Sequence, residues 1–259
     1  MTVTILTDNF PGSHTAAEHG LSYLIEHDGK KLLFDTGQSD LFLKNASAMG
    51  IDVTDIDLII LSHGHFDHGN GLEHLSGGSL VCHPDCFVKR YRKKDNLYIG
   101  LKNTKDEISR KFNLIPAEKS YRVTDRIFFS GEIPRVTGFE SQSTPFVFEN
   151  GTSDFVIDDS ATGFLLKEGL FVVTGCGHSG IVNTLEHMKK ITGTDKIYGI
   201  MGGFHLKEID RQTRETIQYL RENNIQHVYP SHCTALPVLL LFLKTFNLEQ
   251  VVTGKVFEF

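Results

Sequence analysis

Residues 63 to 68 read His-Gly-His-Phe-Asp-His and follow the apolar segment 57–61, which has the composition of a buried strand. Three imidazoles and one carboxylate are therefore concentrated where a strand is predicted to end. Imidazole nitrogens and carboxylate oxygens are ligands that Zn²⁺ and Mn²⁺ accept, and no packing requirement explains such a cluster. A polar loop that happens to be rich in histidine is the alternative. We predict a site for a divalent metal ion at this strand end.

Length and charge narrow the class of protein further. A chain of 259 residues, 40% of them hydrophobic, is near the upper size of one core, so residues 1–259 are predicted to form a single domain. The formal net charge of −6 disfavours a nucleic-acid partner, and no apolar run reaches the length of a membrane span. The chain starts with a strand-like segment and not a signal peptide, and its four cysteines suit a reducing compartment. We therefore expect a cytoplasmic protein with no membrane partner, and its oligomeric state stays open.

Short apolar runs alternate with amphipathic segments in both halves of the chain. Predicted strands cover residues 2–6, 21–26, 31–35, 57–61, 163–166, 170–174, 196–201 and 227–229. Predicted helices cover residues 40–49, 208–221 and 236–246, and another begins near 181 and ends before Gly193. Two such halves, each with helices on a sheet, predict an α/β protein with a four-layer αβ/βα sandwich.

The alternation breaks between about residues 84 and 150. This stretch has little periodicity and contains a basic run at 89–94. We expect it to be an insertion that covers the site and holds an anionic small-molecule substrate through its guanidinium and ammonium groups. A solvated surface helix is the alternative for the basic run. The predicted substrate-binding residues are Lys89, Arg90, Arg92 and Arg135.

Four further candidates stand where other apolar runs end. They are Asp35 after 32–34, His178 after 171–174, His205 after 196–201, and His232 after 227–230. Because strand ends at one edge of a sheet can bring side chains to a shared cleft, His178 and His232 are predicted metal ligands. His205 is a candidate for a metal ligand, a proton donor or a substrate contact, and a buried structural role is its alternative.

The pattern His-x-His-x-Asp-His, formed by His63, His65, Asp67 and His68, resembles the signature of the metallo-β-lactamase superfamily. The resemblance implies that the first two histidines serve one metal and that the Asp-His pair serves a second. It also implies that Asp35 braces the histidine loop without touching the metal. The four-layer sandwich is the fold that this resemblance implies.

The chain departs from the superfamily pattern at two positions. Asp158-Asp159 falls near the usual third histidine of the first metal, and Cys176 stands where a bridging aspartate is usual. Either His178 replaces that histidine or the metals are held differently, so Cys176, Asp159 and His205 remain additional candidate ligands. A thiolate would favour Zn²⁺ over Mn²⁺. We expect one or two divalent ions, zinc in preference to manganese or iron.

A set of short segments narrows the resemblance to one subgroup. Together they resemble the superfamily members described as dihydropterin-methyl-(ribofuranosyl)aminobenzene phosphate synthase-like, and the match runs across nearly the whole chain. The segments are 34–37, 131–135, 158–159, 174–178, 202–206 and 232–234. The resemblance implies the fold and the metal site more strongly than it implies a substrate.

These features predict a metal-dependent hydrolase that acts on a phosphate or a phosphorylated ester. A bound metal would make hydroxide available near neutral pH. Asp67 would move the proton of that water, and His205 would protonate the leaving group. Two alternatives stay open. One is a synthase in which an aromatic amine displaces pyrophosphate from a pterin carbon, and the other is a non-catalytic sensor that binds a metal or ligand.

Overall fold

Two large sheets organise the computed structural model, which describes residues 1–259, and each sheet belongs to a different unit of the chain. The first unit consists of Met1–Glu118, Thr144–Asp158 and Val252–Phe259. The second unit consists of Lys119–Ser143 and Asp159–Val251. None of the helices in either unit is both long and apolar enough to cross a membrane.

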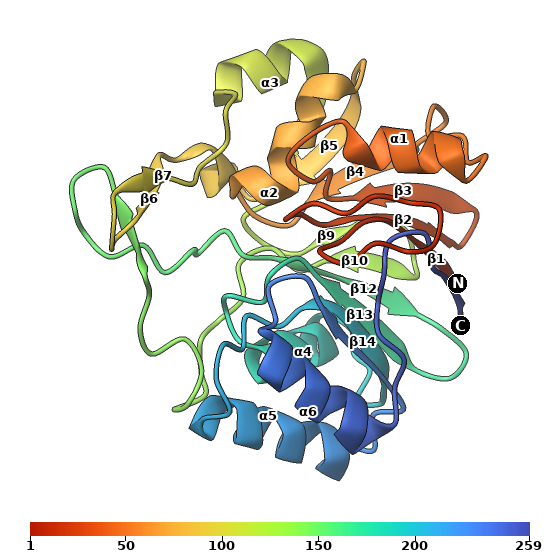
Figure 1. The fold of residues 1–259 in the computed structure, drawn as a ribbon, viewed down its shortest axis with the longest axis vertical. Helices are drawn as coiled ribbons and strands as arrows, with labels where there is room; N and C mark the ends of the chain where they lie inside the picture. The colour runs from red at the N-terminus through yellow and green to blue at the C-terminus, as the bar shows by residue number, and fades with distance from the viewer. The chain divides into compact units, whose positions relative to one another are not determined.

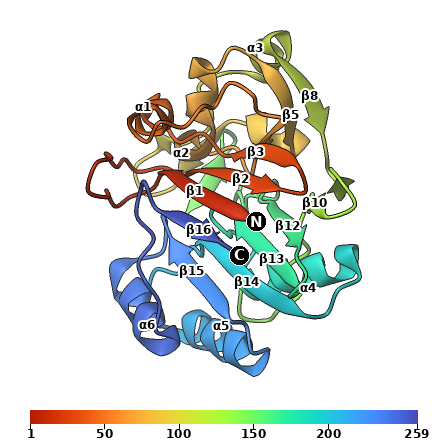
Figure 2. The same ribbon diagram turned by 90° about the vertical axis from the view of Figure 1, so that its right-hand side faces the viewer.

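The first unit is built on a seven-stranded mixed sheet in the order β16-β1-β2-β3-β4-β5-β8. Strands β3, β4, β5 and β8 run parallel, whereas β16, β1, β2 and β3 pair antiparallel. Figure 2 shows the two chain ends beside each other, where β1 pairs with β16. The strands are β1 (Thr2–Thr7), β2 (Ser22–His27), β3 (Lys30–Phe34), β4 (Leu58–Leu61), β5 (Gly78–Cys82), β8 (Phe112–Pro116) and β16 (Val256–Glu258).

Helices α1 (Leu41–Ala48), α2 (Phe66–Gly69) and α3 (Lys105–Lys111) lie on one side of this sheet (Figure 1). Two short 3-10 helices flank β5: η1 (Asn70–His74) follows α2, and η2 (Pro84–Phe87) follows β5. Buried apolar side chains of α1 and the central strands, among them Phe42, Leu33, Ile59 and Leu80, form the core of this unit. This packing fixes the end of β4, from which the histidine loop leaves.

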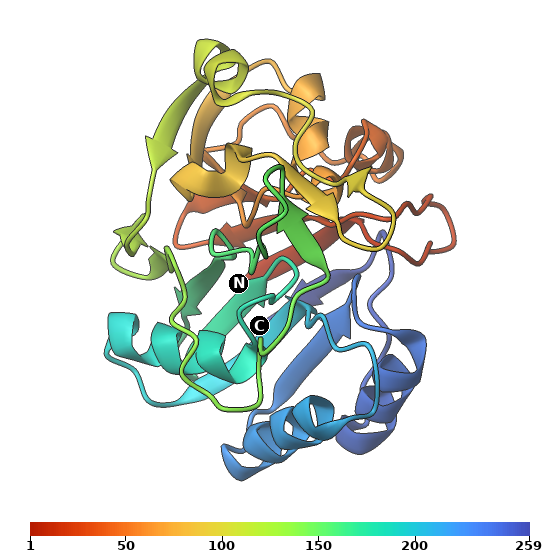
Figure 3. The ribbon, with the colours of Figure 1, turned by 90° about the vertical axis from the view of Figure 1, so that its left-hand side faces the viewer.

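A small three-stranded sheet, in the order β11-β6-β7, also belongs to the first unit. It consists of β6 (Arg90–Arg92), β7 (Leu97–Tyr98) and β11 (Phe146–Phe148). Figure 3 shows the yellow β6 beside the green β11, which pair antiparallel. The basic run therefore contributes a strand, and the alternative of a surface helix is wrong for residues 90–92.

The second unit is built on a six-stranded sheet in the order β15-β14-β13-β12-β10-β9, in which β13, β14 and β15 run parallel. Helices α4 (Ile181–Thr192), α5 (Arg211–Glu222) and α6 (Leu236–Phe246) lie on one side of it (Figure 1), around a core of its own. The strands are β9 (Tyr121–Arg122), β10 (Ile127–Phe129), β12 (Ala161–Leu165), β13 (Leu170–Thr174), β14 (Ile197–Gly203) and β15 (His227–Ser231).

Helix α5 begins at Arg211, three residues later than the sequence predicted. The reason is local, because the side chain of Asp210 accepts a hydrogen bond from Thr213 N at 3.0 Å and so caps the helix. Residues 84–150 contain more regular structure than their weak periodicity suggested. They supply β8 to the first sheet and β9 and β10 to the second. Their predicted place over the site, like the prediction of a single domain, stays a prediction.

Candidate metal centre

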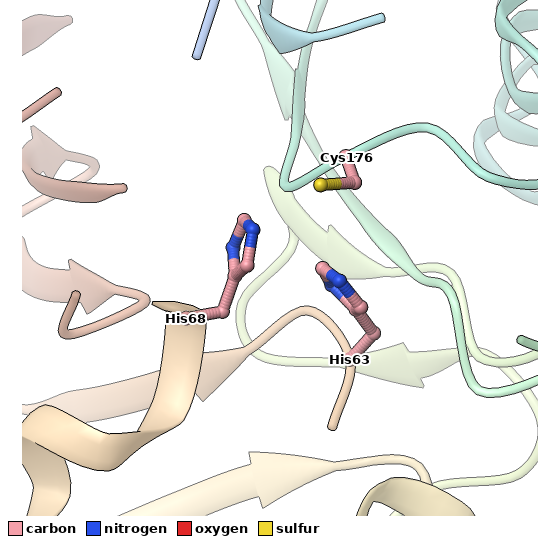
Figure 4. Close-up of side chains that lie close together, drawn as sticks. All are labelled: His63, His68 and Cys176. Atoms are coloured by element: carbon pink, nitrogen blue, oxygen red, sulfur yellow. The ribbon is translucent and has the colours of Figure 1, made fainter. Parts of the chain in front are cut away.

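The loop between β4 and α2, together with α2 itself, brings three imidazoles close together. His63 and His65 lie in the loop and His68 lies on α2. His63 Nε2 is 3.0 Å from His65 Nδ1, and the ring centroids of His63 and His68 are 4.2 Å apart. Figure 4 shows the His63 and His68 rings beside each other, one from the loop and one from the helix. All three rings are buried.

Burial lowers the pKa of His63 well below its ordinary value, and the neighbouring His68 and His65 lower it further. This shift favours the neutral imidazole. A neutral imidazole keeps a lone pair on one ring nitrogen, which is the form that binds a metal. The histidine loop can therefore offer a nitrogen lone pair to a metal ion.

Asp35 holds this loop from the end of β3. Its Oδ1 accepts a hydrogen bond from Ser62 N, and its Oδ2 accepts from Ser62 Oγ and from His68 Nδ1, each at 2.7 Å. The bond to Nδ1 leaves Nε2 of His68 as the lone-pair atom. Asp35 has a φ of 54°, a left-handed conformation that is uncommon outside glycine and typical of functional sites. The resemblance to the superfamily implied a brace at this position.

A second carboxylate holds the same loop from a distant part of the sequence. Asp158 accepts a hydrogen bond from Gly64 N at 2.7 Å with Oδ2 and from Arg90 Nη2 at 2.8 Å with Oδ1. Arg90 Nε also lies 3.4 Å from Asp154 Oδ2. A Cβ on Gly64 would lie 1.8 Å from the carbonyl oxygen of Cys86, so the loop can pack here only with glycine. Sequence reasoning did not find this arrangement.

Arg90 is 1% exposed, and both of its aspartate partners are fully buried. Burial opposes its charge, but Asp158 and Asp154 raise the pKa of the guanidinium. Arg90 was predicted to bind the anionic part of a substrate. Its buried pairing removes it from the proposed substrate-binding residues and makes it a support for the histidine loop.

The other basic residues keep contact with solvent. Lys89 Nζ lies 2.9 Å from Glu149 Oε1, in an ion pair that is exposed on both sides. Arg92 pairs with Asp95 on a partly exposed surface. Arg135 Nε donates to Ser141 Oγ at 3.0 Å in the second unit. Exposed ion pairs are weak, so an anion can compete for these cations.

Asp67 lies beside a histidine that the sequence did not single out. Its Oδ2 is 3.0 Å from His19 Nε2 and 3.9 Å from His68 Nε2. Asp67 is buried, whereas His19 is exposed. His19 follows no apolar run, so no strand-end signal marked it. Through this contact, a proton can pass from the buried carboxylate to a solvent-exposed imidazole.

In the second unit, the candidate ligands follow three neighbouring parallel strands. Cys176 and His178 follow β13, His205 follows β14 and His232 follows β15. The ring centroids of His178 and His205 lie 4.3 Å apart. His205 and His232 both have a φ of 49°, so two of the four stand in a left-handed conformation that the surrounding fold must enforce.

Two buried carboxylates hold the segment that carries Cys176 and His178. Asp159 Oδ2 accepts a hydrogen bond from Ser179 N at 2.8 Å. Glu140 accepts from Val182 N at 2.9 Å and from Asn183 N at 2.8 Å, in the first turn of α4. Burial raises the pKa of Glu140, and these backbone bonds oppose that shift. Asp159 therefore contacts the backbone beside His178, and its role as a ligand stays a prediction.

Cys176, His232 and Cys233 form a second group of ligand atoms, all of which lie within 4.8 Å of one another. Cys233 Sγ donates to the carbonyl oxygen of Cys176 at 3.4 Å. Burial opposes ionisation of the Cys233 thiol, but a hydrogen bond from the side chain of Cys176 and the nearby His232 lower the pKa of Cys233 well below its ordinary value. Cys176 was a predicted candidate, whereas sequence reasoning missed Cys233 although it adjoins His232. Figure 4 shows Cys176 on a loop, which follows β13.

These donor sets fit a divalent metal by their chemistry. The first unit offers neutral imidazoles oriented by Asp35 and a buried carboxylate, and the second offers imidazoles and thiols. In the first unit, His63, His65, Asp67 and His68 lie close together. In the second unit, His178 lies beside His205, and Cys176 lies close to His232.

The amino-acid sequence is similar to one protein family and to two proteins of one archaeal species. The family model described as the metallo-beta-lactamase superfamily matches residues 16–79, which include the histidine loop. An uncharacterized protein of Methanocaldococcus jannaschii is 32% identical, and the match covers 98% of each chain. The 7,8-dihydropterin-6-methyl-4-(beta-D-ribofuranosyl)-aminobenzene-5'-phosphate synthase of the same organism is 30% identical over 98% of this chain and 95% of its own.

The crystal structure of Tm1679, described as a metal-dependent hydrolase of the beta-lactamase superfamily, matches the fold with a TM-score of 0.89. The two sequences are 29% identical, and the match covers 100% of this chain and 99% of the other. The predicted α/β fold class is thereby confirmed.

Proposed function

This chain belongs to the metallo-β-lactamase superfamily, and on that premise we propose that it is a metal-dependent hydrolase acting on a phosphate or a phosphorylated ester. The observation that carries the proposal is the buried group of His63, His65 and His68, which Asp35 orients through His68 Nδ1. The hydrogen bond to Asp35 leaves the lone pair of His68 on Nε2, the atom that a metal ion would bind. The proposed ligands of one or two divalent ions are His63, His65, Asp67, His68, His178 and His232, with Cys176, Asp159 and His205 as further candidates.

A divalent ion, when bound, supplies a water molecule of lowered pKa, about 7, and polarises the scissile bond. Asp67 would accept a proton from a water molecule held at the site. Because Asp67 Oδ2 lies 3.0 Å from His19 Nε2, the proton can pass to an exposed imidazole and from there to solvent. His205 donates a proton to the leaving group.

The proposed substrate is a small anion. Lys89 and Arg92 carry exposed charges on and beside β6, and Arg135 lies in the segment that follows β10. One guanidinium group can donate two parallel hydrogen bonds to two oxygens of a phosphate, and an ammonium group adds a point charge. We propose Lys89, Arg92 and Arg135 as the residues that hold the anionic part of the substrate.

A synthase is the second candidate function, because the relative of 30% identity is named as one. In that reaction an aromatic amine displaces pyrophosphate from a pterin carbon, so the same metal would serve a different nucleophile. The fold alone does not decide between the two reactions, which differ in the nucleophile, water or an aromatic amine, and in the group that leaves.

The test is a substrate panel on protein reloaded with Zn²⁺ or Mn²⁺ after chelation. Phosphomonoesters, phosphodiesters, phosphorylated esters and lactams are assayed, together with a pterin pyrophosphate and an aromatic amine. We expect phosphate release from a phosphorylated substrate that stops when the metal is removed. Pyrophosphate release that requires the amine would favour the synthase. Metal binding without turnover of any substrate would favour a sensor.

The exposed cations provide a further prediction. Replacing Lys89 and Arg92 together with alanine should raise KM for a phosphorylated substrate, with a smaller effect on kcat, because the lost interaction is electrostatic attraction to the bound anion. The dependence of kcat/KM on salt should also become weaker. Lys30 and Arg122 stand in comparable exposed ion pairs elsewhere, so their double alanine variant is the control. An unchanged KM at low salt would assign the basic run to the solvated surface.

A further inference from the structure

Cys233 is a buried thiol to which neither the superfamily pattern nor the proposed mechanism gives a role. It adjoins His232 and is 8% exposed, and Cys176 and His232 are each 3% exposed. We propose that Cys233 is a metal ligand that acts together with Cys176 and His232, so that the second unit carries a thiolate-rich metal site. This inference rests on the proposed function, since it requires that the protein binds a divalent ion.

The geometry of the three side chains suits a four-coordinate metal. Their ligand atoms all lie within 4.8 Å of one another. Zinc binds sulfur at about 2.3 Å and imidazole nitrogen at about 2.0 Å, which puts neighbouring ligand atoms of a tetrahedral site about 3.5 Å apart. Binding one ion would therefore bring three atoms that already lie within 4.8 Å of one another to about this spacing.

The absence of a side chain at Gly203 allows the loops that carry Cys176 and Cys233 to pack against each other. A Cβ on Gly203 would lie 2.6 Å from Cys233 Sγ and 3.1 Å from Cys176 Cα, so any side chain there would separate the two cysteines. Glycine at 203 is therefore required by the contact between the loops. His232 holds a strained φ of 49° between Ser231 and Cys233, which turns consecutive side chains into the same region.

Local polar contacts hold Cys233 in place. Lys207 Nζ donates to the carbonyl oxygen of Cys233 at 2.7 Å, and Thr234 N donates to the carbonyl oxygen of Ser231 at 3.0 Å. Thr234 Oγ1 in turn accepts from Phe204 N at 3.2 Å. These bonds tie the end of β15 to the end of β14 and fix the backbone on both sides of the thiol.

The charge balance also favours such a site. On binding, each thiol releases its proton to solvent and the sulfur lone pair forms the bond to the metal, with no oxidation or reduction. Two thiolates and one neutral imidazole then balance the charge of a divalent ion, so the buried site gains no net charge. Thiolate is a soft ligand, so the site should select Zn²⁺ over Mn²⁺.

X-ray absorption at the zinc edge of the wild-type protein tests the proposal without any substitution. The number of sulfur neighbours per zinc, multiplied by the measured zinc content, gives the zinc-bound sulfurs per chain. We expect two sulfurs at about 2.3 Å. Cys233→Ala and Cys176→Ala should each lower the number by one. Cys82→Ala, which removes a buried thiol at the end of β5, is the matched control and should leave it at two.

One sulfur or none per chain in the zinc-loaded wild type would overturn the proposal, and so would a count that depends on Cys82. The wild-type count decides the question even if the Cys233 variant does not fold. A protein that retains no zinc at all would instead contradict the proposed function. Measurements on one zinc-loaded preparation therefore distinguish failure of the Cys233 proposal from failure of the proposed function.

Discussion

Replacing His205 with alanine should lower kcat by about 10²-fold to 10⁴-fold and leave the metal content unchanged, which is the effect of losing a positioned general acid. The fold holds His205 in a left-handed conformation at the end of β14, with its ring 4.3 Å from that of His178. Such a position places a proton donor beside a proposed ligand. The loss should be smaller for substrates with good leaving groups, because these leave without a proton.

His227→Ala is the matched control for this variant. His227 is also a half-buried histidine of the second unit, and it lies against Tyr198 on β14, outside the candidate ligands. It should keep kcat near the wild-type value. If the His205 variant loses metal, His205 is a ligand and the proton donor is another residue. Full activity with full metal content would make His205 structural.

Replacing Arg90 with methionine should destabilise the protein by about 3–5 kcal/mol, because it leaves buried carboxylates without their cation. Arg90 Nη2 donates to Asp158 Oδ1 at 2.8 Å, and Asp158 Oδ2 accepts from the amide of Gly64. The loss should therefore reach the histidine loop and weaken metal binding as well. Chemical denaturation of the metal-free protein measures the first effect, and metal titration measures the second.

Arg92→Met is the control for this prediction. Arg92 lies two residues away on the same strand and pairs with Asp95 at a partly exposed surface, where an ion pair contributes about 1 kcal/mol or less. Adding Asp158→Asn to Arg90→Met should recover part of the stability, because it removes one unpaired charge. Equal stability of the Arg90 and Arg92 variants would contradict the role of Arg90 as a buried brace.

The sequence predicted best those elements that a pattern of neighbouring residues marks, such as an apolar run. The apolar runs that became β4, β13 and β15 also located the polar residues that follow them. Apolar periodicity alone does not locate the first residue of a helix, as Asp210 and Thr104 illustrate. Asp210 delays the start of α5, and Thr104 forms a capping box with Glu107 that begins α3. Both signals are readable in the sequence.

The rest of the site depends on contacts that are distant in sequence. Arg90 belongs to a basic run that looks like an exposed surface, and its burial follows from pairing with Asp154 and Asp158, more than 60 residues later. Glu140 caps α4 from 42 and 43 residues away. No periodicity or spacing rule encodes such partners, because the folded backbone alone brings them together.

Metal stoichiometry measured by elemental analysis tests the central claim most directly. The protein is stripped with a chelator, reloaded with Zn²⁺ or Mn²⁺ and freed of excess ion, and its Tm is measured with and without metal. We expect one or two ions per chain and a higher Tm with metal, since a ligand that binds only the folded state stabilises it by mass action. His63→Ala should reduce both, whereas His227→Ala should not. No bound metal in the wild-type protein, together with an unchanged Tm, would contradict the account.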